Sequence, residues 1–120
     1  MTITELQQQY AAHPHTDAVN KLLNDTSVKH LFCGGLCASA ASFFLFSLIR
    51  KYDVPFVFIL GDLEEAGYFY HDLTQILGTE RVLFFPSSFR RAIKYGQKDA
   101  ANEILRTEAL SRLEKGDTSV

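Results

Sequence analysis

Residues 33–42 read CGGLCASAAS, and they lie between a short apolar run and a long apolar segment. An apolar strand, a glycine turn and a helix N-terminus, in that order, form a setting in which backbone N–H groups can face a phosphate. Against the phosphate-loop pattern G-x-x-x-x-G-K-[ST], Gly35 and Ser42 are in register. However, Ala40 and Ala41 stand where the second glycine and the lysine belong. The stretch therefore indicates a nucleotide-binding frame that has lost its nucleotide chemistry.

Length and composition describe one globular domain or part of one. The chain has 120 residues, of which 47% are apolar, enough for a single core. Its net charge of −2 gives no electrostatic case for nucleic-acid binding by the chain as a whole. Arg50 and Lys51 end the longest apolar stretch before it reaches the ~18 residues of a membrane span. Because Glu5 and a run of Gln replace the basic region of a secretion signal, we expect a cytoplasmic protein without membrane contact.

Strand-like and helix-like segments alternate along the chain from residue 28 onward. Helical patterns cover 3–12, 16–24, 39–52, 62–77 and 99–115, and strand-like runs cover 28–33, 55–60 and 81–85. This alternation is typical of right-handed βαβ units. We therefore predict an α/β three-layer sandwich with a short parallel sheet, preceded by an N-terminal helical extension at 1–27. Residues 118–120 look like the start of a fourth strand, so we expect an N-terminal piece of a longer protein.

Local signals place the ends of several helices. Thr4, with a Gln three residues later, predicts a capping box on the first helix, and Thr16 or Asp17 is expected to cap the second. Asp62 is expected to cap the helix at 62–77, which Gly78 should end. Asp62 also imitates the acid of a Walker B strand, although a helix cap explains it as well.

Other candidate groups carry no specific catalytic pattern. Cys33 and Cys37 read as small buried apolar residues. The four histidines have no triad-like spacing, and with only two cysteines a four-ligand zinc site cannot be assembled from thiolates alone. One basic and aromatic cluster could be a solvated surface, a docking face or a nucleic-acid contact, and it consists of Phe89, Arg90, Arg91, Lys94, Tyr95 and Lys98.

Two interpretations of the loop remain open: a plain strand-to-helix turn, or a vestigial phosphate loop formed by Gly35, Ala40, Ala41 and Ser42. In the second, N–H groups near Ser39 could still hold a weakly bound anion. In both, we expect the two alanines to be packing residues that let the following helix sit close to the sheet. The corresponding functions are an interaction scaffold or, alternatively, a nucleotide-binding P-loop-type enzyme domain with weak or altered phosphate binding.

Four short motifs together resemble one known family. They are the loop at 33–42, GDLEEA at 61–66, LFFP at 83–86 and NEILRTEALSRL at 102–113. Over roughly residues 28–120 the chain resembles the N-terminal segment of bacterial transcription-repair coupling factors. That segment is in turn similar to the first ATPase subdomain of the excision-repair protein UvrB. UvrB carries glycine, lysine and threonine where this chain has Ala40, Ala41 and Ser42, and the coupling factors lack a working site there.

The resemblance implies more than the residues show. Residues 28–120 would be an incomplete P-loop NTPase (RecA/helicase-like) subdomain, truncated at its C-terminus, without catalytic residues, cofactor or metal. The whole protein would be a DNA translocase that removes stalled RNA polymerase at lesions and recruits UvrA through regions beyond Val120. ATP and magnesium would bind in its separate C-terminal domains. The expected partners of this segment are adjacent subdomains of the same chain.

Overall fold

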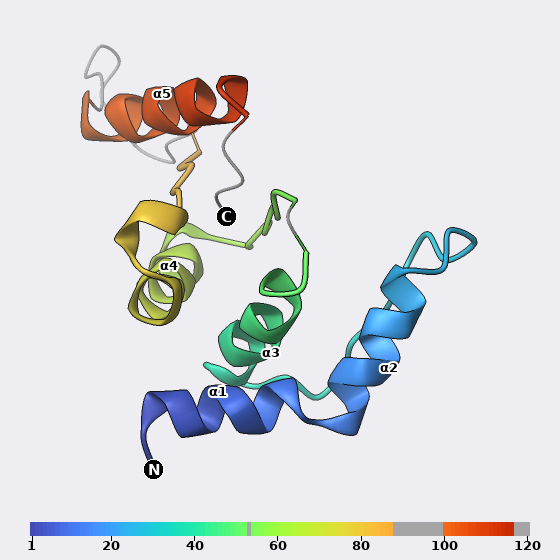
Figure 1. Cartoon of the computed structure of the whole chain (residues 1–120). Coiled ribbons are helices and arrows are strands. Elements are labelled where there is room, and N and C mark those ends of the chain that lie inside the picture. Colours follow the sequence, from blue (N-terminus) through green and yellow to red (C-terminus); the bar gives the residue numbers. More distant parts are fainter. Residues whose placement is uncertain (53, 88–99, 117–120) are drawn as a thin grey trace. The chain divides into compact units, whose positions relative to one another are not determined.

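The structure, a computed structural model, describes residues 1–52, 54–87 and 100–116, and the regular elements in these ranges are all helices, joined by irregular segments (Figure 1). The elements are α1 (Ile3–Ala11), α2 (Pro14–Leu23), α3 (Ala40–Ile49), α4 (Leu63–Leu77), the 3₁₀ helix η1 (Thr79–Arg81) and α5 (Ala100–Glu114). The chain divides into two compact units, Met1–Asp53 and Val54–Val120. No helix in the described ranges combines the length and the apolar composition that a membrane span requires.

The predicted α/β sandwich is wrong, because the described residues contain no strand and no sheet. The three segments expected as strands, 28–33, 55–60 and 81–85, lack regular secondary structure, except that Arg81 ends η1. An apolar run becomes a strand only when its N–H and C=O groups pair with a neighbouring strand, and that pairing is not encoded within the run itself. The parallel sheet and its flanking helix layers are therefore replaced by helices joined by irregular segments.

Aromatic side chains of two of these segments pack on a helix instead. The ring of Phe58 lies 5.5 Å from that of Phe69 on α4, and the ring of Phe84 lies 5.3 Å from that of Tyr70 on the same helix. Such aromatic pairs bury apolar surface without any ladder of backbone hydrogen bonds. The apolar segments that suggested strands thus pack on α4 with one of their sides only.

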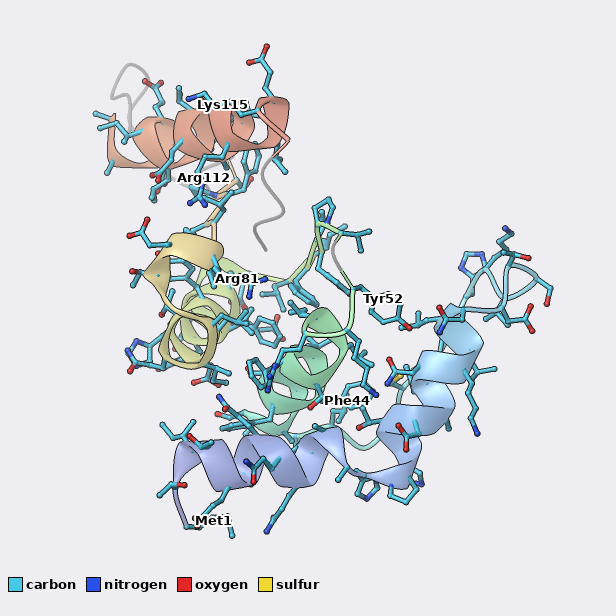
Figure 2. The ribbon with its side chains drawn as sticks, in the orientation of Figure 1. Met1, Phe44, Tyr52, Arg81, Arg112 and Lys115 are labelled. Carbon is cyan, nitrogen blue, oxygen red and sulfur yellow. The ribbon has the colours of Figure 1, made fainter. Side chains whose placement is uncertain are left out.

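In the first unit, α3 packs against both α1 and α2. It carries the buried apolar residues of this unit, which are Phe44, Phe46, Leu48 and Ile49. The rings of Tyr10 on α1 and Phe43 on α3 are stacked at 5.6 Å. Just after α3, Tyr52 reaches toward α2 (Figure 2) and its hydroxyl donates to the carbonyl of Asn20 at 3.3 Å. Helix α3 is therefore the centre around which the N-terminal unit is built.

The caps of the first two helices differ from those expected. The box on α1 uses Thr2 and not Thr4: the Glu5 N–H donates to Thr2 Oγ1 at 3.2 Å, and the Thr2 N–H donates to Glu5 Oε2 at 2.6 Å. Helix α2 begins earlier than predicted, and its cap is His13. Thr16 is buried instead, and its hydroxyl donates to the carbonyl of Tyr10 at 2.7 Å. This bond ties the first turn of α2 to the end of α1.

In the second unit, the predicted ends of α4 are confirmed. Asp62 caps the helix by accepting from the Glu65 N–H at 2.8 Å, and the helix ends at Gly78. Among the described residues of this unit, the buried apolar ones are Leu73, Val82 and Ala109. Helix α5 contacts the segments after α4 through Arg106, whose guanidinium lies 5.4 Å from the ring centre of Phe85, and through Arg112, which donates to the carbonyl of Glu80.

Candidate functional site

The loop at residues 33–39 supplies hydrogen-bond acceptors to the start of α3. The Ala40 N–H donates to the carbonyl of Cys37 at 3.0 Å, and the Ala41 N–H donates to the carbonyl of Ala38 at 3.4 Å. Gly35 adopts a φ of +83°, and Ala38 adopts +47°, so the chain turns back sharply before the helix. A phosphate loop needs these first N–H groups to be free for the anion. Here the loop itself engages them.

The four residues of the predicted vestigial loop differ in their exposure to solvent. Gly35 is exposed, Ala40 and Ala41 are half-buried, and Ser42 is fully buried at 0% exposure. In a working loop the hydroxyl at the last position reaches magnesium, which requires access from solvent. The two alanines were expected to pack against a sheet, and that expectation is wrong since the described residues contain no sheet.

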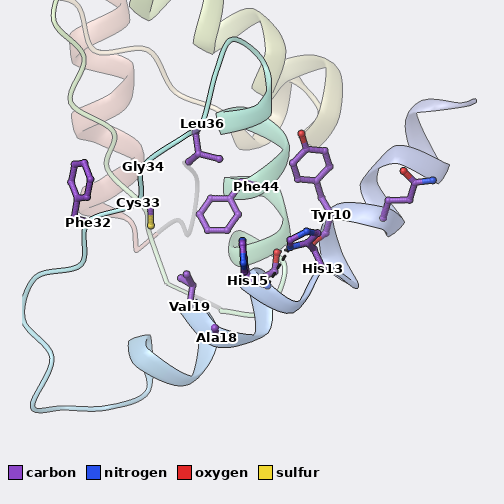
Figure 3. A pocket seen from close by; sticks show the side chains of 12 residues that line it. Tyr10, His13, His15, Ala18, Val19, Phe32, Cys33, Gly34, Leu36 and Phe44 are labelled. Atoms are coloured by element: carbon purple, nitrogen blue, oxygen red, sulfur yellow. Dashed lines mark hydrogen bonds between the residues drawn. The ribbon is translucent and has the colours of Figure 1, made fainter.

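A pocket of about 510 Å³ lies beside this loop in the first unit (Figure 3). Its walls come from the end of α1, the start of α2, the segment at 32–36 and α3. The lining residues are Gln9, Tyr10, His13, His15, Thr16, Ala18, Val19, Phe32, Cys33, Gly34, Leu36 and Phe44. Within the CGGLC turn, Cys33, Gly34 and Leu36 line this pocket, and Gly35 is not among its lining residues. The volume is within the range of small-molecule sites.

Two histidines define the corner between α1 and α2 at this pocket. The His15 N–H donates to Nδ1 of His13 at 3.2 Å, which fixes the ring of the capping residue. The two imidazole rings meet edge to face, with their centres 4.8 Å apart. Figure 3 shows both histidines among the residues that line the pocket, with Tyr10, Leu36 and Phe44. Sequence reasoning treated this His-Pro-His stretch only as a helix break. It missed the pocket because the wall exists only once two helices and a distant loop are placed together.

The lining of the pocket does not favour a phosphate ligand. It contains no Lys or Arg to neutralise an anion and no Asp or Glu to bind a metal ion, and its nitrogen and sulfur ligands are limited to His13, His15 and Cys33. The described residues also contain no cluster of three or more His, Cys, Asp or Glu side chains that could hold a metal. The apolar part of the lining, from Val19 to Phe44, instead matches an aliphatic or aromatic group with a few polar contacts at one edge.

The structure also places the cysteines and Asp62, the other candidates from the sequence. Cys33 and Cys37 are free thiols and both are exposed, so the prediction that they are buried is wrong. Asp62 serves as a helix cap, as the simpler of its two interpretations expected. The basic and aromatic cluster at 89–98 lies outside the described residues.

Comparisons of the chain with protein-family models, with curated proteins and with solved structures found no match.

Proposed function

We propose that this chain is a non-catalytic structural and interaction segment at the N-terminus of a transcription-repair coupling factor in the cytoplasm. In this proposal its partners are the adjacent subdomains of the same polypeptide. ATP and magnesium bind elsewhere in that protein, and UvrA, RNA polymerase and DNA are contacted through regions outside residues 1–120. The proposal takes its family from the four motifs at 33–42, 61–66, 83–86 and 102–113, and it does not depend on a sheet.

The start of α3 is the observation that carries the non-catalytic part of the proposal. Ala41 stands where a phosphate loop has its lysine, and the N–H groups of Ala40 and Ala41 already donate to loop carbonyls. The hydroxyl of Ser42 is buried. A lost lysine removes a charge-assisted hydrogen bond worth about 1.5–3 kcal/mol, before any role in catalysis is counted. Backbone, side-chain and access requirements for nucleotide binding all fail at the same turn.

The pocket beside the turn supports an interaction role. Its lining lacks formal charge and includes Leu36, Phe44 and the almost wholly exposed ring of Phe32. An apolar side chain from an adjacent subdomain could fill such a pocket and cover Phe32 at the same time. A nucleotide, with several negative charges, would find no Lys or Arg among the lining residues.

Calorimetric titration with Mg·ATP tests the non-catalytic assignment. We expect binding weaker than about 1 mM for the native chain. The double variant Ala40→Gly/Ala41→Lys restores the missing pattern, and Ala40→Gly/Ala41→Met is its matched control, with a side chain of similar length and no charge. We expect neither variant to release phosphate, and both to have unchanged or lower stability. Micromolar, magnesium-dependent binding by the native chain, or turnover by the lysine variant, would favour the alternative of a nucleotide-binding enzyme domain.

A separate observation tests the family. The gene should continue past the codon for Val120 into UvrB-like and then helicase-like segments. A reading frame that continues into an unrelated domain would contradict the assignment, whatever the titration shows.

A further inference from the structure

The segment at 55–60 has no regular secondary structure, and its side chains alternate between two environments. Phe56, Phe58 and Leu60 are half-buried, and Phe58 packs on α4. The residues between them point the other way: Val57 is 79% exposed and Ile59 is 93% exposed. A period of two is the side-chain repeat of a β-strand. The segment therefore has the form of a strand with one covered face and one open face.

The backbone of this segment is also unpaired at the two exposed residues. In the described part of the chain, neither Val57 nor Ile59 makes a hydrogen bond through its N–H or C=O group. Exposed strand edges of this kind pair readily with another extended chain, and β-branched side chains favour such pairing. No charged residue lies between positions 54 and 61 to oppose it.

We propose that this segment pairs with the same segment of a second copy of the chain, as a two-stranded antiparallel interface. With Phe58 of one copy opposite Phe58 of the other, each Val57 lies opposite the Ile59 of the second copy. The exposed apolar side chains then meet on one face, and the free N–H and C=O groups of Val57 and Ile59 bond across the pair. The pairing is self-complementary, as a two-fold interface must be.

The two ends of the segment carry opposite charge, which favours pairing with a second copy and favours the antiparallel direction. Residues 50–53 carry a net charge of +1, with Lys51 Nζ also 3.4 Å from Asp17 Oδ1 in an exposed ion pair, and residues 62–65 carry a net charge of −3. Chain connectivity holds Lys51 within about 11 Å of Val54. An antiparallel pair therefore brings the basic end of each copy beside the acidic end of the other, twice. A parallel pair would instead place like charges together.

The size of the contact sets the strength expected. A pair of six-residue strands buries less than the roughly 1,200 Å² of a standard stable interface. We therefore expect a weak dimer, with a molar mass that rises with concentration between about 1 and 500 µM.

Sedimentation equilibrium of the native chain and three lysine variants tests the proposal. Ile59→Lys places a charge opposite Val57 of the second copy, and we expect at least tenfold weaker association. Ile104→Lys is the matched control, since Ile104 is 66% exposed on α5 and outside the segment. It should associate like the native chain. Val57→Lys is a second variant expected to behave like Ile59→Lys, and circular dichroism should show native helix content in all three.

Four outcomes would overturn the proposal. They are a native chain that stays monomeric, an Ile59→Lys variant that associates normally, equal loss in the Ile104→Lys control, and masses that grow beyond the dimer.

Discussion

Two glycines of the same helix should respond in opposite directions to the same substitution. Gly67 lies inside α4, and Gly78 ends it with φ +92° and ψ 149°. A Cβ added at either position meets no atom within 4 Å, so neither substitution causes a clash. Any difference in stability must therefore come from the backbone conformation alone.

The expected magnitudes follow from that conformation. An alanine at Gly78 is forced into a region nearly confined to glycine, which costs about 1–3 kcal/mol. Reduced freedom of the unfolded chain offsets about 0.4–1 kcal/mol of this, leaving a net loss of about 1–2 kcal/mol. Gly67→Ala should instead raise the free energy of unfolding by about 0.5–1 kcal/mol, because glycine is a poor residue inside a helix.

Urea unfolding followed by circular dichroism measures both variants against the native chain. With a slope of about 1–3 kcal/mol per molar urea, the two midpoints should separate by roughly 1 M. A neutral or stabilising Gly78→Ala would refute the reasoning, because it would mean that α4 does not end with a positive φ in solution. A Gly67→Ala variant that lowers the midpoint would refute the helical assignment of that residue.

Three further changes test the packing and the first cap. Leu73 is 2% exposed on α4, so Leu73→Ala should lower the free energy of unfolding by about 2–5 kcal/mol, measured by the same urea transitions. The side-chain amide nitrogen and oxygen of Asn20 are both buried without a hydrogen-bond partner, so Asn20→Leu should raise the free energy of unfolding by about 1–3 kcal/mol, measured by calorimetry. A lower free energy of unfolding would show that the amide is hydrogen-bonded. The hydrogen bond from the Thr2 N–H lowers the pKa of Glu5, so the contribution of its charged carboxylate to α1 is present at neutral pH and is lost as the pH falls below the ordinary value of 4.5 and through the lowered pKa. Helicity of α1 followed by NMR should fall over that range, and Glu5→Gln should flatten the dependence.

Helix ends could be predicted where a short-range signal is unambiguous. Asp62 and Gly78 bound α4 as expected because a cap and a glycine stop act within four residues of the chain. At the N-terminus the same logic picked the wrong threonine. Thr2 and Thr4 both precede an acceptor by three residues, but only Thr2 is followed by a glutamate, whose charged carboxylate accepts the stronger hydrogen bond from the cap N–H.

The strands and the pocket could not be predicted in the same way. Residues 55–60 do show a period-two environment, but whether a neighbouring strand pairs with them depends on residues far away. The predicted three-layer sandwich requires cover on both faces of this run, whereas only one face packs on α4. The sequence contains even less pattern that could predict the pocket. Its walls are the histidine corner near His13 and the loop near Cys33, which are some twenty residues apart.

The proposed subdomain contact and the proposed dimer both rest on an exposed apolar side chain, but on a different one in each case. Phe32 is 94% exposed at the pocket of the first unit, and Ile59 is 93% exposed in the second. Single exposed apolar residues are ordinary on a protein surface, whereas one beside a pocket or in a row along an unpaired backbone marks a contact site. The proposed subdomain contact requires Phe32 and not Ile59, and the proposed dimer requires the reverse. Phe32→Lys should therefore leave self-association unchanged while weakening binding of the chain to the next subdomain supplied in trans, and Ile59→Lys should do the opposite. If either variant impaired both, a single shared surface would replace the two separate ones.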